Sequence, residues 1–452
     1  MRGRALGAVA MAGALVLGIA APSSASSSED LESGLWYFER GHVQDAHDAG
    51  FDGTGVTVAV IDTQINPDVI GLRGANIEVR EPSYCYDEAG EPYPATSTDY
   101  IAAHHGTNVA SMIVGSGEAP AGGVPIKGVA PGASLLYYDA SVPADPTDPM
   151  STEIECTQAN GAPLRSEDDL TGQGAAILDA IDAGADIISI SSTFDFMNTD
   201  TIAKAHAAGV VVVVALVNDQ LSQVQVVPNG AVGVQSFDAD GMIQSTTTWE
   251  GTEQHANNDD QVVASGPGVG VLLQGTRESW DAQSLSGGTS FATPIVAGFL
   301  AVVKQKYPDA TAGQLIQSLI HNTGTKGEHE PEWNSSTGYG AASLTGMLAV
   351  DPTKYPDVNP IFDADDEFGS PSTADVREAE RELEAAESPA PTTGPDKETA
   401  AQESASTALP AWLPWAIGGG IVAALLIIGG VILALVRART SRRRNAEPEE
   451  RA

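Results

Sequence analysis

The sequence predicts an α/β fold in three layers with a mostly parallel central sheet, and three observations predict it. Segments rich in β-branched apolar residues alternate with segments of helical periodicity, which is typical of consecutive βαβ units. Two of the strand-like segments, residues 56–61 and 210–215, are apolar without interruption, as strands covered on both faces are. Residues 295–303 are apolar on every side, which predicts a helix buried at the centre of a large domain.

The expected elements follow one another in chain order. Before the insertion at residues 141–171 we expect a helix at 44–49, a strand at 56–61, a helix opening at the pair His104-His105, and a strand at 134–140. After it we expect helices at 174–183, 201–208, 295–303 and 312–321, strands at 187–191, 210–215, 230–235 and 262–264, and a closing segment at 341–350. Residues 76–100 are polar and turn-rich, and Pro294 is expected in the first turn of its helix.

Length and charge restrict the classes of protein that remain. The 452 residues allow one large domain of roughly 300 residues with appendages. Lys and Arg number 22 against 60 Asp and Glu, a formal net charge of −38, which argues against a nucleic-acid partner. Much of the acidity lies late in the chain, since residues 361–400 hold 12 acidic and 3 basic side chains.

The two ends of the chain predict a membrane topology. Residues 1–25 resemble a secretory signal peptide, although an uncleaved anchor is the alternative. Residues 411–436 are apolar and long enough to span a bilayer, with tryptophans at the outer edge and arginines in the tail, 437–452. We therefore expect a single-pass protein of the cell membrane, with its main domain at 26–350 outside and its C-terminus in the cytoplasm.

The remaining segment and the cysteines lead to two further expectations. Residues 351–408 are rich in Pro, Ser, Ala and acidic residues and predict an extended linker. Within it we expect 374–387 to form a solvated helix that serves as a spacer, with an interaction site as the alternative. Cys85 and Cys156, the two cysteines of the chain, lie in irregular segments expected outside the cell. We expect them to form one disulfide in this oxidising compartment.

Three residues have the chemistry of an acyl-transfer site. Asp62 follows the strand at 56–61, where functional residues of parallel sheets gather. His105 opens a helix, and Ser290 precedes the apolar run at a helix start, where backbone N–H groups favour negative charge. A carboxylate, an imidazole and a hydroxyl make a triad in which Asp62 orients His105 and His105 activates Ser290 as nucleophile. Alone, Ser290 has the simpler interpretation of a helix cap.

The local sequences resemble the subtilisin-like serine proteases, peptidase family S8. The matching segments are Val58-Ala59-Val60-Ile61-Asp62-Thr63, His105-Gly106-Thr107 and Gly288-Thr289-Ser290, in the chain order Asp, His, Ser. The resemblance implies a subtilisin-like fold and peptide hydrolysis by Asp62, His105 and Ser290. His104 is then a flanking residue without a catalytic role.

The resemblance also implies further site residues. Asn218, after the strand at 210–215, matches the side-chain donor of the oxyanion hole. Ser191, Ser192 and Thr193 match the strand that pairs with the substrate backbone. Two residues depart from the family pattern, because Gln64 and Val217 stand where the family places glycine.

The arrangement of segments resembles one branch of the family, the mycosins of type VII secretion systems. A signal peptide, a subtilase domain, a proline-rich linker, one membrane helix and a short tail occur in this order. The resemblance implies a membrane-anchored extracellular protease associated with a secretion complex and acting on peptide or protein substrates.

Two other interpretations fit parts of the sequence. A dinucleotide-binding protein is disfavoured because Gly53-Thr54-Gly55 precedes its strand, whereas a phosphate-binding loop follows one. A weakly active or inactive scaffold with the same fold stays open, because Gln64 and Val217 depart from the pattern. No cofactor is expected; subtilases often bind calcium through loop oxygens, but the sequence offers no metal-ligand set that can be assigned.

Overall fold

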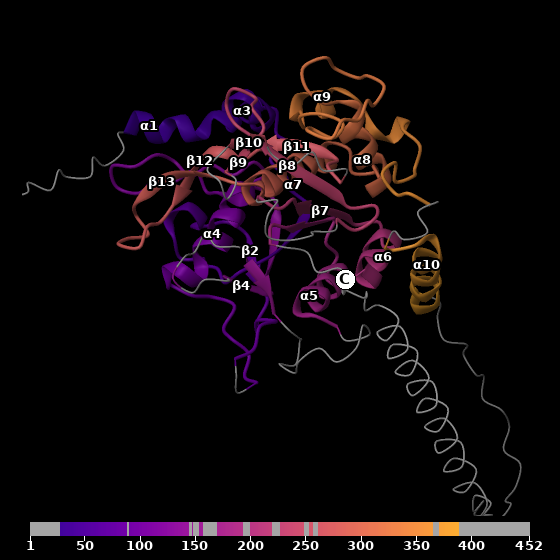
Figure 1. Cartoon of the computed structure of the whole chain (residues 1–452), viewed down its shortest axis with the longest axis horizontal. Coiled ribbons are helices and arrows are strands. Elements are labelled where there is room, and N and C mark those ends of the chain that lie inside the picture. The colour runs from indigo at the N-terminus through magenta and orange to yellow at the C-terminus, as the bar shows by residue number, and fades with distance from the viewer. Residues whose placement is uncertain are drawn as a thin grey trace, which may run out of the picture. The chain divides into compact units, whose positions relative to one another are not determined.

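A seven-stranded sheet in which every neighbouring pair is parallel forms the centre of the fold (Figure 1). The strand order is β11-β8-β7-β6-β1-β3-β2. The strands are β1 (Thr57–Asp62), β2 (Ile77–Val79), β3 (Ser134–Asp139), β6 (Ile187–Ile190), β7 (Val211–Ala215), β8 (Val232–Phe237) and β11 (Ala264–Pro267). This computed structural model describes residues 28–87, 90–143, 147, 153–156, 170–192, 199–218, 227–247, 253–255, 261–364 and 370–387.

Helices cover both faces of this sheet, which explains why its strands are apolar without alternation. On one face Val58 and Val60 of β1 join a core with α4 (Tyr100–Val114) and α7 (Thr289–Lys306). On the other face Ala59 and Ile61 meet the core of α5 (Gly172–Asp182) and α6 (Thr199–Ala207). The expected α/β fold with a parallel sheet is confirmed.

Helix α7 is buried along most of its length, as its apolar sequence predicts. Thr289 to Val303 are all buried, and the helix contacts β6, β7, β8 and β11. The expected position of Pro294 in the first turn is wrong, because the helix starts at Thr289 and Pro294 is its sixth residue. Proline has no N–H, so the carbonyl of Ser290 lacks the hydrogen bond that residue 294 would normally donate.

Shorter helices complete the described part of the domain. They are α1 (Ser28–Glu32), α2 (Trp36–Arg40), α3 (Val43–Asp48), α8 (Ala312–His321) and α9 (Leu344–Ala349). The N-terminal helices are tied to the domain by two side chains, since Trp36 Nε1 donates to the Val269 carbonyl at 3.1 Å and Tyr37 Oη to the Lys127 carbonyl at 2.9 Å. Thr311 caps α8 through a capping box with Gln314.

Several strands lie where the sequence predicted no strand. Strand β2 occupies the polar segment 76–100, and an antiparallel hairpin of β12 (Val269–Gln274) and β13 (Gln283–Gly287) leads into α7. Two small hairpins join β4 (Ser141–Pro143) to β5 (Glu153–Glu155) and β9 (Ser245–Thr247) to β10 (Glu253–His255). Strands β2, β4, β5, β9 and β10 have three residues each and β13 is mostly Gly, Ser and Gln, so they lack the longer apolar pattern from which strands are predicted. Strand β12 has four apolar residues among six, a signal that the sequence interpretation missed.

The prediction of an extended linker is wrong for its first part. Residues 351–364 and 370–387 pack on the domain, through reciprocal hydrogen bonds between Asn229 and Asp363 and through helix α10 (Thr373–Glu387). Val376 and Ala379 of α10 are buried against Ala203 of α6. The acidic composition conceals this apolar contact, because it involves only one face of the helix.

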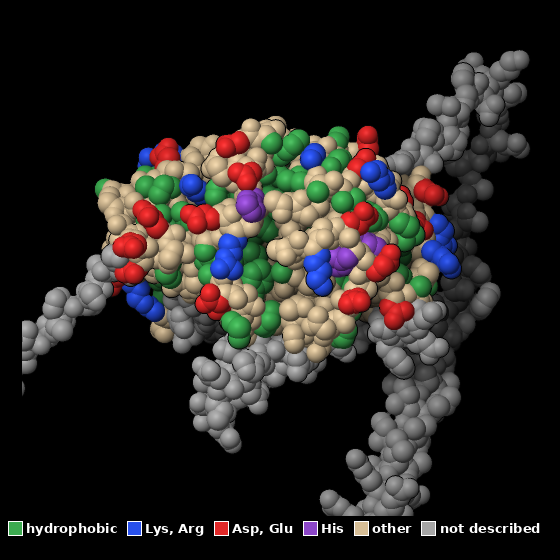
Figure 2. Space-filling view, turned by 90° about the horizontal axis from the view of Figure 1, so that it is seen from above, with side chains coloured by type: hydrophobic (Ala, Val, Ile, Leu, Met, Phe, Trp, Pro, Cys, Tyr) green, Lys and Arg blue, Asp and Glu red, His purple; other side chains and the backbone are tan. Residues whose placement is uncertain are grey.

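The expected signal peptide at 1–25, the rest of the linker, the membrane span at 411–436 and the tail at 437–452 lie outside the described residues. Among the described residues, none of the helices has the length and apolar character needed to cross a membrane. On the face drawn in Figure 2, acidic and basic side chains are scattered and Lys and Arg form no broad patch.

Candidate active site

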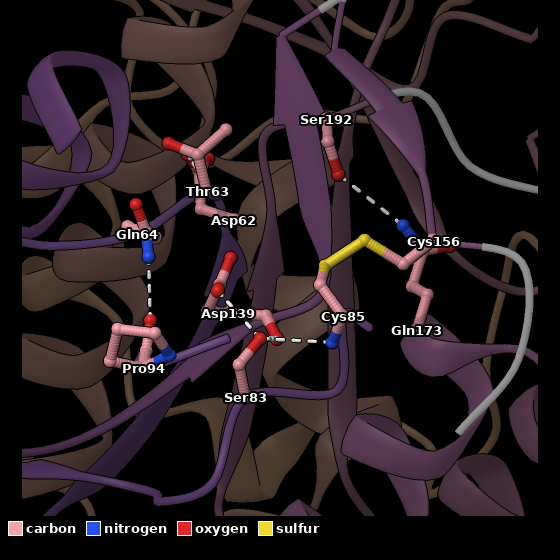
Figure 3. Close-up of a disulfide and its surroundings, with 10 residues drawn as sticks. All are labelled: Asp62, Thr63, Gln64, Ser83, Cys85, Pro94, Asp139, Cys156, Gln173 and Ser192. Carbon is pink, nitrogen blue, oxygen red and sulfur yellow. Dashed lines mark hydrogen bonds between the residues drawn. A yellow bond between two sulfur atoms is a disulfide. The ribbon is translucent and has the colours of Figure 1, made fainter. Parts of the chain in front are cut away.

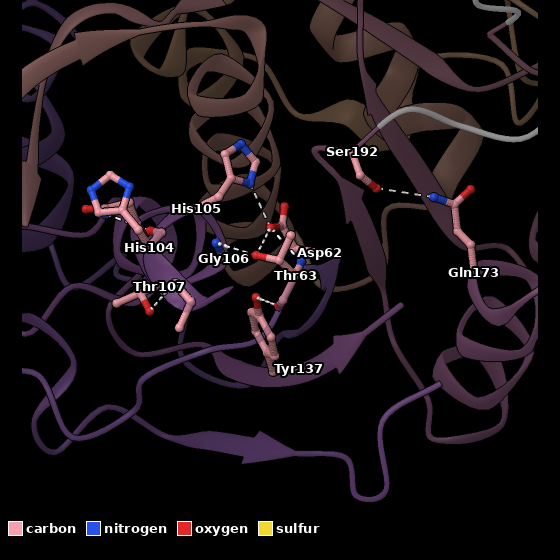
Figure 4. A network of polar contacts seen from close by, with 11 residues as sticks. Asp62, Thr63, His104, His105, Gly106, Thr107, Tyr137, Gln173 and Ser192 are labelled. Carbon is pink, nitrogen blue, oxygen red and sulfur yellow. Dashed lines mark hydrogen bonds and ion pairs between the residues drawn. The ribbon is translucent and has the colours of Figure 1, made fainter. Parts of the chain in front are cut away.

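Asp62 and His105 form a buried pair at the carboxyl end of β1. His105 Nδ1 lies 2.7 Å from Asp62 Oδ1, and the two side chains are 2% and 0% exposed (Figure 4). A carboxylate oxygen only accepts, so Nδ1 carries the proton and Nε2 remains the basic nitrogen of the neutral ring. The pair therefore fixes both the tautomer and the orientation of the imidazole.

The carboxylate of Asp62 is held by its neighbour in the chain. The backbone N–H of Thr63 donates to Asp62 Oδ1 at 2.8 Å, and Thr63 Oγ1 lies 3.3 Å from the same oxygen. The hydroxyl of Tyr137 on β3 donates to the carbonyl of Thr63 at 2.6 Å, which ties this turn to the next strand. Burial, then the charge of Asp62, raises the pKa of Tyr137 far above its ordinary value, so this hydroxyl keeps its proton.

Gly106 lets α4 approach the end of β1 closely. A Cβ atom at this position would clash with the Tyr137 hydroxyl and would lie 2.8 Å from the Thr63 carbonyl oxygen. Gly106 N–H also donates to Thr63 Oγ1 at 3.2 Å. Because only glycine fits here, the Gly that follows His105 in the sequence motif has a direct packing reason.

Ser290 is the second residue of α7 and is 7% exposed. The ring of Phe291, the next residue, lies 5.8 Å from the ring of His105 between centroids. Helices α4 and α7 thus bring the sequence-predicted histidine and serine to the same end of the sheet. In the first turn of α7 the N–H of Thr289 donates to Asn218 Oδ1 and the N–H of Phe291 to the Gly288 carbonyl at 3.1 Å. The N–H of Ser290 lies too early in the helix for an intrahelical partner and can donate to a ligand.

Asn218 lies beside the start of α7. The backbone N–H of Thr289 donates to Asn218 Oδ1 at 2.9 Å, and Thr289 Oγ1 lies 3.2 Å from the same oxygen. Since an N–H can only donate, the accepting atom is the oxygen, and the Nδ2 amide is left as the donor of this exposed side chain. Val217, the residue before Asn218, is half-buried, and it does not keep Asn218 from contacting the start of α7.

Ser191 and Ser192 directly follow β6 and are both 2% exposed. Gln173, fully buried at the start of α5, donates from Nε2 to Ser192 Oγ at 3.3 Å. Thr193 lies outside the described residues. The other departure from the family pattern, Gln64, has a structural contact, because its Nε2 donates to the Pro94 carbonyl at 2.6 Å.

The structure joins Cys85 and Cys156 in the expected disulfide, with their Cα atoms 5.1 Å apart (Figure 3). The N–H of Cys85 donates to Ser83 Oγ at 2.9 Å, and Ser83 Oγ donates to Asp139 Oδ2 at 2.6 Å. The bridge therefore anchors residues 83–85, which contact the carboxyl end of β3 through the hydrogen bond from Ser83 to Asp139. In the sheet, Asp139 is paired with Asp62 of β1.

His104 has an environment unlike that of His105. It is 2% exposed and lies among Tyr100, at 4.4 Å between ring centroids, and Trp280, at 6.4 Å. Neither ring nitrogen has a hydrogen-bond partner within the described residues, and in Figure 4 the ring points away from Asp62. Burial, then repulsion from His105, lowers the pKa of His104 to about 3, so the ring is neutral.

Asp139 is a buried acid that the sequence reasoning missed. It is 1% exposed at the end of β3, and burial, then repulsion by Asp62, raises its pKa well above the ordinary value although the Ser83 hydroxyl opposes this shift. The rule that pointed to Asp62, a polar residue at the carboxyl end of a strand, applies equally to Asp139. The residues around Asp139 match no motif, so its place at the end of a strand was the one signal in the sequence.

The site has an oriented imidazole, a serine at a helix N-terminus and an exposed amide donor, which together suit acyl transfer. In the part of the chain that the structure describes, three or more His, Cys, Asp or Glu residues do not come together as a metal site.

Comparisons with known proteins place this geometry in context. A sequence model described as the subtilase family matches residues 53–340. Fervidolysin of Fervidobacterium pennivorans is 27% identical over 338 residues, which are 71% of this chain and 44% of fervidolysin. Mycosin-1 of Mycolicibacterium smegmatis is 27% identical over 309 residues, 59% of this chain and 63% of that protein. The chain thus spans less than two thirds of these relatives.

A solved structure agrees with the fold. The crystal structure of fervidolysin, described as a keratinolytic enzyme related to subtilisin, superposes with a TM-score of 0.51 at 23% sequence identity. The superposition covers 72% of this chain and 47% of that structure.

Proposed function

The chain belongs to the subtilase family, and from this premise we propose that it is a serine endopeptidase that uses Asp62, His105 and Ser290. The observation that carries the proposal is the buried hydrogen bond of 2.7 Å between His105 Nδ1 and Asp62 Oδ1. This bond leaves His105 Nε2 as the base, on a ring that packs against Phe291 next to Ser290.

In the proposed reaction Ser290 Oγ attacks the carbonyl carbon of a peptide bond while His105 Nε2 takes the hydroxyl proton. The negative charge of Asp62 stabilises the imidazolium that forms, without itself taking the proton. His105 then gives the proton to the leaving amine, and an acyl-enzyme on Ser290 remains. Water attacks this ester with the same base, which restores the free serine.

The negative charge on the former carbonyl oxygen needs donors. Asn218 Nδ2 is one, because Asn218 Oδ1 already accepts from Thr289, and the N–H of Ser290, the second residue of α7, is the other. We further propose that the substrate extends along residues 191–193 as an added strand, since Ser191 and Ser192 directly follow β6.

The setting of the reaction is also part of the proposal. The apolar span at 411–436 and the tail arginines support a membrane anchor with the catalytic domain outside the cell. The sequence similarity to mycosin-1 supports an association with type VII secretion. With protease added outside intact cells, the domain should be released while a tag on the C-terminal tail stays protected; digestion of the tag would refute this orientation.

The catalytic proposal is tested by cleavage of unstructured peptides with the purified full chain. His105→Ala should lower kcat/KM by several orders of magnitude, because the base is lost. The matched control is His104→Phe, which keeps the ring packing against Tyr100 and Trp280 and should retain activity. If the native chain cleaves no peptide at any concentration, the interpretation as an inactive scaffold replaces the proposal.

A further inference from the structure

We propose that the buried hydroxyl of Tyr137 holds Thr63 in place and, through Thr63, fixes the carboxylate of Asp62 in the triad. The inference rests on the proposed function, since it concerns how the residues of that triad are held. In the proposed reaction Tyr137 touches no reacting atom, so it is a positioning residue that acts through Thr63.

The register of the sheet brings the Tyr137 hydroxyl to the carboxyl end of β1. In the parallel pair of β1 and β3, Tyr137 is paired with Val60, two residues before Asp62. Paired residues of neighbouring strands have their side chains on the same face, and two residues of a strand span about 6.6 Å. The tyrosine side chain is long enough to cover this distance, so its hydroxyl reaches the turn that follows Asp62.

The hydroxyl of Tyr137 and its partner lie away from solvent. Tyr137 is fully buried, Thr63 is 1% exposed, and Tyr137 Oη donates to the Thr63 carbonyl at 2.6 Å (Figure 4). Among the described residues no other donor to this carbonyl is seen. Without the hydroxyl the carbonyl would be unpaired in the interior, which is unfavourable. Loss of the hydroxyl should therefore displace Thr63 towards another donor.

Thr63 in turn connects two members of the triad. Its N–H donates to Asp62 Oδ1 at 2.8 Å, and its hydroxyl lies 3.3 Å from the same oxygen. This hydroxyl also accepts from the N–H of Gly106, the residue after His105, at 3.2 Å. Because Asp62 Oδ1 is the atom that His105 Nδ1 contacts at 2.7 Å, a displacement of Thr63 changes the orientation of the catalytic imidazole.

Close packing around the Tyr137 hydroxyl restricts where it can lie. A Cβ atom on Gly106 would overlap this hydroxyl and would lie 2.8 Å from the Thr63 carbonyl oxygen, so the three groups are packed tightly together. The hydroxyl thus fills the space between the end of β1 and helix α4. Burial, then the charges of Asp62 and Asp139, raises the pKa of Tyr137 far above its ordinary value, so the hydroxyl remains a donor.

A second buried tyrosine provides a matched control for the loss of a hydroxyl. Tyr37 of α2 is 2% exposed, and its hydroxyl donates to the Lys127 carbonyl at 2.9 Å. Lys127 lies before β3 in the chain, whereas Thr63 lies at the end of β1 beside Asp62. Tyr37→Phe and Tyr137→Phe therefore each remove one buried hydroxyl from a backbone carbonyl. Both should lower the melting temperature by similar amounts.

The experiment measures peptide cleavage by the purified full chain. Tyr137→Phe should lower kcat about tenfold or more with KM within about twofold, because a misplaced catalytic group weakens binding of the transition state and not of the substrate. Tyr37→Phe should keep kcat within about twofold of wild type. The downfield proton NMR signal of His105 Nδ1–H, which lies in the bond to Asp62, should shift in Tyr137→Phe and stay in place in Tyr37→Phe.

A double variant tests whether the effect passes through Thr63. Thr63→Val removes the hydroxyl that links Asp62 to Gly106 and should itself lower kcat. Tyr137→Phe combined with Thr63→Val should lose less than the product of the two single losses, because contacting residues that act on one carboxylate are not independent.

Three results would overturn the inference. The first is an unchanged kcat with an unchanged NMR signal in Tyr137→Phe. The second is an equal loss of kcat in Tyr137→Phe and Tyr37→Phe, which would mean that stability alone is affected. The third is a fully multiplicative loss in the double variant, which would mean that Tyr137 acts independently of Thr63. An inactive wild type whose signal still shifts in Tyr137→Phe would refute the proposed function and leave the positioning of Asp62 standing.

Discussion

Removal of the disulfide should lower the stability of the domain by an amount that its loop length determines. Cys85 and Cys156 are 71 residues apart in the sequence, and both are buried. In the chain-entropy model, closing a loop of this size restricts the unfolded chain and stabilises the fold by about 4 kcal/mol. The double variant Cys85→Ala, Cys156→Ala removes the bridge without leaving a buried hydroxyl.

The loss converts into a shift of the melting temperature. A domain of about 330 residues has an unfolding entropy of about 0.7 kcal/mol per degree, so about 4 kcal/mol corresponds to about 6 °C. Scanning calorimetry of the full chain, wild type beside the double variant, measures this shift. Thiol counting on the unfolded, unreduced wild type should find no reactive thiol. Two thiols, or equal melting temperatures in the two proteins, would refute the reasoning.

Three further predictions concern Asn218, His104 and helix α10. Asn218→Ala should lower kcat by about 10²–10³ with KM little changed, which is the effect of removing the equivalent donor in subtilisin. If Asn218→Ala leaves kcat unchanged, the oxyanion donors lie elsewhere, and Val217→Gly should then raise activity. The pKa of His104, lowered to about 3, means that the folded state binds fewer protons than the unfolded state below about pH 6.5, so stability is lost as the pH falls. His104→Phe should therefore gain about 2 kcal/mol over wild type between pH 7.5 and pH 5 in urea unfolding, and parallel pH profiles would contradict this. Val376→Asp should undock α10 from α6 and speed proteolysis within residues 373–387, whereas Ala374→Asp, the same charge on the exposed face, should not; equal rates would mean that the contact with Ala203 does not hold the helix.

The elements predicted correctly from the sequence are those in which the pattern of apolar residues reflects burial. Strands β1 and β7 are covered on both faces, so their residues are apolar throughout, and α7 is apolar on every side for the same reason. Strand β2 has only three residues and β13 is mostly polar, so neither shows such a pattern. They form because a neighbouring strand supplies hydrogen bonds, and this partner cannot be read from the local sequence.

The C-terminal segment shows a second limit. Its average composition is acidic and proline-rich, yet α10 needs only Val376 and Ala379, three residues apart on one helix face, to pack on α6. The average composition of the segment does not show two apolar residues at this spacing. The complementary surface on α6 exists only after the domain has folded.

For the candidate site, local motifs identified Asp62, His105, Ser290 and Asn218, because each lies in a short matching segment. The residues around them were missed where the contact is long-range. Asp139 approaches Asp62 through strand pairing, and Tyr137 reaches Thr63 across the same pair of strands. Neither contact leaves a signature in the neighbouring sequence.

The central claim is that Ser290 is a nucleophile activated by the buried pair of His105 and Asp62. The most direct measurement is labelling of the purified full chain with a fluorophosphonate, followed by mass spectrometry of the peptide that contains residue 290. The account predicts one adduct on Ser290 in wild type and in Ser286→Ala, a control on the neighbouring strand β13, and none in Ser290→Ala. Equal labelling of Ser290→Ala and wild type would contradict the account.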